Sequence, residues 1–315
     1  MDKLILLAPA ISFVIGVIGI AIMIPVLKKL NFGQQVRQEG PQAHLAKSGT
    51  PTMAGIVIII AMVLGSLMFV RDMNTVVLLV ITFIFGIIGL LDDSLKILKK
   101  QSEGLKAWQK MAFEIVAAVA LVLYVAIATE NGTQTMIPFY GTVDIGWWYY
   151  PLAIVAVLGT VNGANFTDGV DGLSSSVTIV ICVFLAGASV FLGYTYAAPA
   201  LAYAGALCAY LLYNAYPAKV FMGDTGSLAM GGFVAAAALL MKIPIFIIIF
   251  AFVYVAEIVS VILQVGYFKL THGKRLFKMT PIHHHFELSG FSETRTVVLF
   301  TTVTVICCII AYIGL

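Results

Sequence analysis

Charged residues are scarce in this chain: only 10% of its 315 residues are Asp, Glu, Lys or Arg, whereas 61% are hydrophobic. With a mean hydropathy of +1.03, a soluble domain of this size could not bury its apolar surface in its own core. The four cysteines have neither metal-ligand spacing nor the pattern of a disulfide framework. No repeat, low-complexity tract or long linker divides the sequence. These absences exclude a soluble enzyme and a disulfide-rich secreted domain, and they predict a single membrane domain over residues 1–315.

Long apolar runs are abundant. About ten of them, mostly long enough to cross a hydrocarbon core of roughly 30 Å, predict membrane-spanning segments. Backbone groups in lipid must be hydrogen-bonded within their own segment, so each run is expected to be a helix. The fold class is therefore an all-α integral membrane protein with about ten transmembrane helices. The predicted spans lie near residues 4–27, 51–70, 74–91, 108–128, 151–164, 176–193, 199–216, 228–241, 244–267 and 296–313.

The basic residues are distributed unequally between the two predicted faces. Fifteen of the 18 fall in the odd-numbered loops or beside them, and only Lys3, Arg71 and Lys242 lie on the other side. Since cytoplasmic loops carry an excess of Lys and Arg, the odd loops are expected in the cytoplasm and both termini outside. The outer face has one longer segment, residues 129–150, in which Asn131-Gly132 and an alternating pattern predict a small β-hairpin.

The inner loops carry most of the acids, amides and histidines. A channel or carrier would place such groups near the middle of the membrane. Their concentration at one surface instead favours a reaction between a cytosolic molecule and a membrane molecule. No nucleic-acid partner is expected.

The first inner motif is "LLDDSLKILKK", in which Asp92 and Asp93 are followed by Lys96 one helical turn later. Mg²⁺ is usually held by one or two carboxylates together with substrate phosphates, and Lys binds phosphate as a point charge. The motif suits a site for Mg²⁺ and phosphate, although a solvated polar helix end would show the same residues.

A second motif, "VNGANFTDGVDGL", repeats a polar side chain every third residue, at Asn162, Asn165, Asp168 and Asp171. Its three glycines favour a helix that breaks into a loop whose amides can approach a ligand. The alternative is ordinary turn chemistry, for which Asn, Asp and Gly are common.

The third motif, "YNAYPAKVFMGDTGSL", places Asp224 just before a predicted span. A helix N-terminus attracts anions through its unpaired N–H groups, and a carboxylate there could anchor a metal that binds phosphate. An ordinary N-cap is the alternative.

The fourth motif, "PIHHHFELSGFSE", contains His283, His284 and His285, three of the five histidines. Successive residues of a helix point about 100° apart, so the three rings could not ligate one ion from a regular helix. They are interpreted as phosphate and substrate binders, with a solvated loop or an adventitious metal site as alternatives. Glu114, Glu257 and Gln264 lie within predicted spans and are given no chemistry, because they could simply brace the bundle.

These motifs together resemble the phospho-N-acetylmuramoyl-pentapeptide transferase family. The similarity runs from about Gly33 to the last span and includes "EGPQAHLAKSGTPTMAG", "DDSLK", "NFTDGVDGL", "NAYPAKVFMGDTGS" and "TPIHHHFELSGFSE". The histidine run is the most telling part, because relatives that transfer other sugar phosphates usually vary it. Ala54 departs from the family pattern, which usually has Gly there, and affects only local packing.

The resemblance implies a ten-span bacterial inner-membrane enzyme, often a homodimer, that faces the cytoplasm and needs Mg²⁺. Such an enzyme transfers phospho-MurNAc-pentapeptide from its UDP carrier to undecaprenyl phosphate, forming lipid I and releasing UMP. Asp224 matches the family's metal-binding Asp, Asp92 and Asp93 match its proposed base or nucleophile, and Lys96 matches the lysine after them. Positions around the nucleotide and substrate are matched by Asn165, Asp168, Asp171, Asn214, Phe221, His283, His284 and His285, and Lys47 and Lys110 are placed in the same site.

A phosphate monoester is already largely ionised near neutral pH, so direct attack by the lipid phosphate is favoured over an aspartyl-phosphate intermediate. Asp92 or Asp93 would then orient the acceptor. Two other functions compete: a GlcNAc-1-phosphate transferase of the same superfamily, and a transporter of a divalent metal or a lipid-linked sugar.

Overall fold

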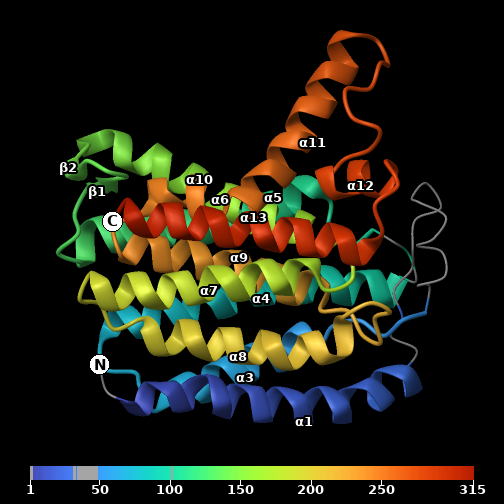
Figure 1. The fold of residues 1–315 in the computed structure, drawn as a ribbon, viewed down its shortest axis with the longest axis horizontal. Coiled ribbons are helices and arrows are strands. Elements are labelled where there is room, and N and C mark those ends of the chain that lie inside the picture. Colours follow the sequence, from blue (N-terminus) through green and yellow to red (C-terminus); the bar gives the residue numbers. More distant parts are fainter. Residues whose placement is uncertain (1–2, 31–32, 34–48, 100, 102) are drawn as a thin grey trace.

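The computed structural model describes residues 3–30, 33, 49–99, 101 and 103–315, and these residues are mostly helical (Figure 1). The longer helices are α1 (Leu7–Lys29), α3 (Gly55–Leu67), α4 (Met73–Lys99), α5 (Ala107–Leu123), α6 (Tyr149–Thr167), α7 (Leu173–Phe191), α8 (Ala197–Asn214), α9 (Gly223–Leu240), α11 (Phe252–Leu270) and α13 (Glu293–Ile313). The shorter elements are η1 (Lys3–Leu6), η2 (Tyr124–Ala128), β1 (Gln134–Ile137), β2 (Gly141–Asp144), η3 (Gly146–Trp148), η4 (Pro244–Phe246), α10 (Ile247–Phe250) and α12 (Ile282–Glu287).

Every predicted span contains a helix, and seven helices among the described residues are long and apolar enough to cross a membrane. Helix α3 is as apolar as these but has only 13 residues. A multi-pass membrane protein is therefore confirmed, and the count of ten spans stays a prediction. The seven are Leu4–Lys29, Met73–Lys99, Ala107–Ala128, Leu173–Phe191, Gly223–Leu240, Phe252–Leu270 and Glu293–Ile313.

The predicted hairpin is present, because β1 pairs antiparallel with β2. Two hydrogen bonds to backbone carbonyls hold this segment against the bundle. The side-chain amide of Asn131 donates to Leu240 O at 2.9 Å, and the backbone N–H of Met136 donates to Lys242 O at 2.7 Å. The hairpin therefore marks the end of the bundle at which α9 finishes. Figure 1 shows both labelled chain ends at this same end.

Helix α9 is the centre of the bundle, with nearly all its residues buried. Its sequence, GDTGSLAMGGFVAAAALL, consists mainly of small side chains, which let neighbouring backbones approach closely in a membrane protein. Helix α4 packs along it, with α6 and α3 also in contact. The first turn of α9 is consequently surrounded by the ends of other helices.

Two helix boundaries differ from those predicted, and both differences concern the charged motifs. Helix α4 continues to Lys99, eight residues beyond the predicted end at 91, so Asp92, Asp93 and Lys96 belong to the helix itself. Helix α9 begins at Gly223, before the predicted start at 228, which puts Asp224 in its first turn. Hydropathy marks where the apolar run ends, whereas backbone hydrogen bonding continues through polar residues once a helix has formed.

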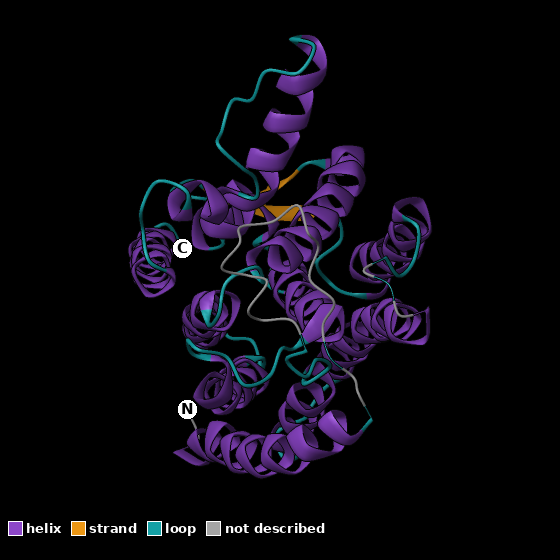
Figure 2. Ribbon diagram, turned by 90° about the vertical axis from the view of Figure 1, so that its right-hand side faces the viewer, coloured by secondary structure: helices purple, strands orange, loops and turns teal. Residues whose placement is uncertain are grey.

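The prediction of one continuous span over 244–267 was wrong. The chain forms η4 and α10, bends at Ala251, and then enters α11. At the bend, Ala251 has φ −106° and ψ 31°, and the carbonyl of Phe250 accepts from the thiol of Cys308 at 3.6 Å. As a result α11 leaves the bundle at an angle (Figures 1 and 2). All four cysteines are free thiols, as expected.

Candidate active site

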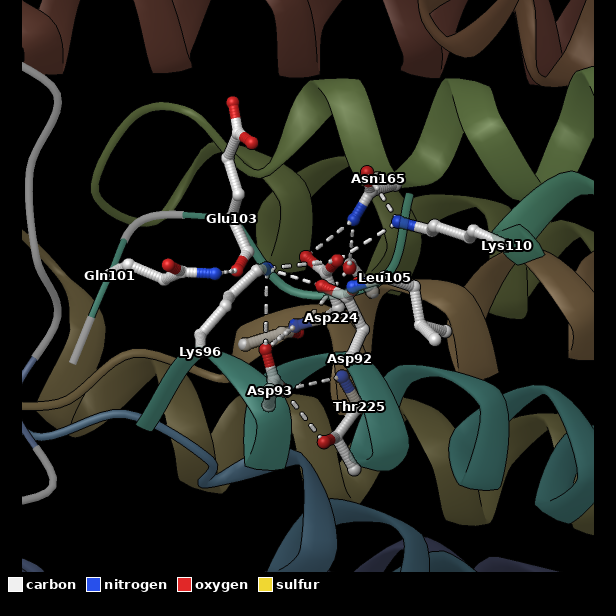
Figure 3. Close-up of polar contacts among 12 residues, drawn as sticks. Asp92, Asp93, Lys96, Gln101, Glu103, Leu105, Lys110, Asn165, Asp224 and Thr225 are labelled. Atoms are coloured by element: carbon white, nitrogen blue, oxygen red, sulfur yellow. Dashed lines mark hydrogen bonds and ion pairs between the residues drawn. The ribbon is translucent and has the colours of Figure 1, made fainter. Parts of the chain in front are cut away.

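Six polar side chains from four helices meet near the first turn of α9 (Figure 3). This charged cluster consists of Asp92, Asp93 and Lys96 from α4, Lys110 from α5, Asn165 from α6 and Asp224 from α9. It lies at the opposite end of α9 from the hairpin. Sequence reasoning named all six, and the structure brings them into direct contact.

Asp224 is the hub of the charged cluster. Its Oδ2 is 3.1 Å from Lys96 Nζ and 2.9 Å from Lys110 Nζ. Its other oxygen, Oδ1, accepts from the side-chain amide of Asn165 at 3.0 Å. One carboxylate thus gathers two cations and an amide from three different helices.

Asp92 shares Lys96 with Asp224. Its Oδ2 is 2.6 Å from Lys96 Nζ, an i,i+4 pair along α4, and its Oδ1 accepts from the backbone N–H of Leu105 at 2.7 Å. Asp92 thereby ties the end of α4 to the segment that leads into α5. Three carboxylates against two ammonium groups leave the charged cluster with a formal surplus of one negative charge.

Asp93 has a different environment, although it is adjacent in sequence. Its Oδ1 accepts from the backbone N–H of Asp224 at 3.1 Å. Its Oδ2 accepts from the backbone N–H of Thr225 at 2.9 Å and from the Thr225 hydroxyl at 2.7 Å. Gly223, with φ +72°, lets the chain enter α9 here, and a Cβ at that position would strike Asp93 Oδ2. Asp93 therefore caps the N-terminus of α9 from a neighbouring helix.

Replacing this cap should mainly affect stability. Asp93→Asn turns one acceptor into an N–H₂ donor that faces backbone donors, so we expect the free energy of unfolding to fall by about 1–3 kcal/mol. Thr225→Val removes only the hydroxyl bond and should cost about 1 kcal/mol. Thermal unfolding of the detergent-solubilised protein, measured by intrinsic fluorescence, checks both values. A loss of turnover in Asp93→Asn with no loss of stability would show that Asp93 acts on substrate directly.

The charged cluster offers suitable ligands for a divalent cation. Oxygens of Asp92, Asp93 and Asp224 all lie within 4.8 Å of one another. Hard cations such as Mg²⁺ prefer carboxylate oxygens and usually take one or two from the protein. Since both Asp93 oxygens bind α9, Asp92 and Asp224 are the better placed ligands. The donor set therefore fits Mg²⁺.

A second group of predicted residues lies in the turn after α6 and the segment before α9. Burial, together with the nearby carboxylates of Asp224 and Asp93, raises the pKa of Asp168 well above its usual range. Asp171 accepts from Ala218 N at 2.9 Å, so its carboxylate joins the two segments. The negative charges of the charged cluster thus act on Asp168, whereas the hydrogen bond of Asp171 holds two backbone segments together.

Asn214 and Phe221 also make backbone bonds. Asn214 accepts from Gly172 N at 2.9 Å and donates to Val220 O at 3.0 Å. The backbone N–H of Phe221 donates to Pro51 O at 2.8 Å. Both residues hold the segment that leads to Asp224, and their hydrogen bonds go to backbone groups outside the charged cluster. Lys47 lies outside the described residues, so its predicted role stays a prediction.

The three histidines lie on the short helix α12 and their rings have different partners. His283 Nδ1 is 3.1 Å from Glu257 Oε1, and both side chains are fully buried. His284 Nδ1 is 2.7 Å from Glu287 Oε2. His285 Nδ1 accepts from Lys278 N at 3.2 Å. The three rings therefore point at different partners, and the prediction that they do not share one ion stays a prediction.

Sequence reasoning missed several partners. Ser227 accepts from Asn165 Nδ2 at 2.8 Å, and the Leu105 N–H binds Asp92. Ser227 could have been found because it follows Asp224 by three residues, which places both on one side of the first turn of a helix. Glu114 lies one helical turn after Lys110 on α5 and was given no chemistry from the sequence. Its carboxylate accepts from Asn162 Nδ2 at 2.6 Å. A backbone donor such as that of Leu105 leaves no signal in a sequence.

Comparison with known proteins shows which family this chain resembles. The glycosyl transferase family 4 model matches residues 75–242, which include all six residues of the charged cluster. A phospho-N-acetylmuramoyl-pentapeptide-transferase of Clostridium novyi (strain NT) is 47% identical over 309 residues, covering 97% of this chain and 95% of the relative. The protein of the same name from Clostridium perfringens (strain SM101 / Type A) is 46% identical over 319 residues, covering 100% and 98%. The chain belongs to the phospho-N-acetylmuramoyl-pentapeptide-transferase family.

Proposed function

We propose that this transferase moves phospho-MurNAc-pentapeptide from UDP to undecaprenyl phosphate, forming lipid I and releasing UMP. The observation that carries the proposal is the charged cluster, in which three carboxylates and two lysines meet at one end of an apolar helix bundle. Phosphoryl transfer depends mostly on positioning and on neutralising phosphate charge. The relatives' name and the cluster's composition support the same chemistry.

The reaction requires that an oxygen of the lipid phosphate form a bond to the phosphorus that carries MurNAc. The bond from that phosphorus to the UMP oxygen then breaks, and UMP leaves with the electron pair. The acceptor phosphate is already largely ionised near neutral pH, so no strong base is needed. We therefore favour direct attack over an aspartyl-phosphate intermediate.

The side chains of the charged cluster have distinct tasks in this scheme. Lys96 and Lys110 bind the diphosphate oxygens as point charges. Asp92 orients the lipid phosphate, since Asp93 is engaged with the N-terminus of α9. Asn165 holds Asp224 in place through its amide. Mg²⁺, held by Asp224 and Asp92, would neutralise charge on the diphosphate when bound.

Remaining residues of the substrate site are proposed from the family resemblance. They are Lys47, Asp168, Asp171, Asn214, Phe221, His283, His284 and His285. Asp168, His284 and His285 fit the role of substrate contacts, whereas His283 is fully buried. The backbone bonds of Asp171 and Asn214 fit the role of holding the site's loops.

We further propose ten spans in the bacterial inner membrane, with the charged cluster in the cytoplasm and both termini outside. The excess of Lys and Arg in the predicted inner loops supports this orientation. The structure also supports this orientation, because the two termini and the hairpin lie at one end of the bundle and the charged cluster lies at the opposite end. A homodimer is proposed from the family resemblance alone.

The test is release of UMP from UDP-MurNAc-pentapeptide by the purified protein with a polyprenyl phosphate acceptor. We expect turnover in Mg²⁺ and its abolition by EDTA, with recovery when Mg²⁺ is restored. UDP-GlcNAc in place of the donor should release no UMP, and a preference for it would point instead to a GlcNAc-1-phosphate transferase. A covalent phospho-enzyme trapped from the nucleotide donor alone would contradict direct attack.

A further inference from the structure

The contact between Glu257 and His283 joins helix α11 to the short helix α12. Glu257 lies in α11, the helix that leaves the bundle, and His283 lies in α12 (Figure 1). His283 Nδ1 and Glu257 Oε1 are 3.1 Å apart, and both side chains are 0% exposed. Ionisable groups are rarely buried in a membrane helix without a functional reason.

The other face of the His283 ring touches the turn after α6. A Cβ added to Gly169 would strike His283 Nε2, so the imidazole rests directly on the backbone of that turn. Gly169 follows Asp168, whose carboxyl senses the charge of Asp224. The His283 ring also lies 4.1 Å, centroid to centroid, from the ring of His284. His283 is therefore held between α11 and a segment next to the charged cluster.

Stability does not explain this arrangement. Glu257 Oε2 and His283 Nε2 are buried without a hydrogen-bond partner among the residues that the structure describes. Buried polar atoms that lack partners destabilise a fold, and an apolar pair of similar volume is often at least as stable as a buried ionic one. The pair is better explained by the position it imposes on His283.

We propose that Glu257 is a positioning residue that acts through His283. When the Nδ1–H of His283 donates a hydrogen bond to the carboxylate of Glu257, the ring orientation is set and Nε2 is directed at Gly169. The contact thereby fixes α12, with His284, and the turn 168–172 relative to each other. This inference rests on the proposed function, because it assigns a role in positioning groups for that reaction.

Two substitutions of Glu257 test the pair. Glu257→Leu removes the acceptor, and we expect kcat to fall about 10- to 100-fold, the usual effect of losing a residue that orients a functional side chain. Its thermal midpoint should also fall, because His283 Nδ1 is left buried without a partner. Glu257→Gln keeps an acceptor oxygen and should restore kcat to within about threefold of the wild type.

Gly169→Ala approaches the same contact from the other side. The added methyl displaces His283, so kcat should fall as in Glu257→Leu, and the double variant should be no worse than the poorer single variant. Gly266→Ala is the matched control on α11, because a Cβ there meets nothing within 4 Å. It should leave kcat unchanged.

Hydrogen exchange provides a readout that does not depend on turnover. Glu257→Leu should speed amide exchange in residues 168–172 and 282–287, and Glu257→Gln should not. If the wild type releases no UMP, the proposed function fails, and the exchange data still decide whether the pair positions these segments. The positioning role is overturned if Glu257→Leu retains wild-type kcat and exchange. It is equally overturned if the loss comes with a lower thermal midpoint that Glu257→Gln does not restore.

Discussion

Asp224→Asn is expected to reduce the rate of UMP release by a factor on the order of 10³. The asparagine keeps the size of the side chain but loses the charge that holds Lys96 and Lys110 at 3.1 and 2.9 Å. It also loses an oxygen ligand for a divalent cation. A factor of 10³ corresponds to about 4 kcal/mol of transition-state stabilisation. Initial rates at saturating donor and acceptor, over a range of Mg²⁺ concentrations, measure the effect.

Asp144→Asn is the matched control for this variant. Asp144 lies in β2 at the hairpin end of the bundle, and its Oδ1 accepts from the Gly146 N–H at 2.9 Å. The same chemical change far from the charged cluster should leave turnover within about twofold of the wild type, as surface substitutions usually do. Equal losses in the two variants would show that the Asp224 effect is not specific. Near-normal turnover in Asp224→Asn would remove Asp224 from the proposed chemistry.

The residues of the charged cluster could be predicted from the sequence because polar side chains stand out at the ends of apolar runs. Their individual roles could not. Asp92 and Asp93 are adjacent residues of the same type, yet their side chains point about 100° apart on α4. Asp92 therefore pairs closely with Lys96 and with the backbone of Leu105, whereas Asp93 binds the first turn of α9. The partner helix decides the role, and the sequence does not show which helix is the partner.

The spans were predictable for a similar reason, since lipid requires long apolar helices. The bend at Ala251 was not, because residues 244–256 carry no charged side chain and the first charge of the segment, Glu257, lies beyond the bend. The thiol of Cys308, 58 residues further along the chain, donates a hydrogen bond to the carbonyl of Phe250 at this bend. Contacts of this kind depend on tertiary packing, which hydropathy does not describe.

For the histidine run, the directions of the rings could be predicted from the sequence, but their partners could not. Helical geometry predicted that the three rings point in different directions, and they have different partners. The pairing of His283 with Glu257 could not be derived, because His283 follows Glu257 by 26 positions and the rest of α11 lies between them in the sequence. Glu257 was recognisable only as an ionisable group inside an apolar run.

Gly89→Ala is expected to impair both folding and turnover. A Cβ at this position of α4 would strike the carbonyl group of Asp224, and it would lie 2.5 Å from the backbone N of Thr225. These are backbone atoms of the buried helix α9, so they cannot rotate away as the end of a side chain can. We expect the free energy of unfolding to fall by about 3 kcal/mol, the upper end for an overpacked core. A displacement of Asp224 by about 1 Å should also lower kcat roughly 10²-fold.

Gly86→Ala, one turn earlier on α4, separates crowding of the backbone from crowding in general. A Cβ there would lie 2.6 Å from Ile59 Cδ1, the far end of a flexible side chain, and 3.6 Å from Ala229 Cβ. Ile59 can change rotamer, so we expect a smaller loss of stability, about 1 kcal/mol, and nearly normal kcat. Both variants are compared by thermal unfolding in detergent and by UMP release. If Gly89→Ala were no worse than Gly86→Ala in either measurement, the close approach of α4 to the first turn of α9 would not be what holds Asp224 in place.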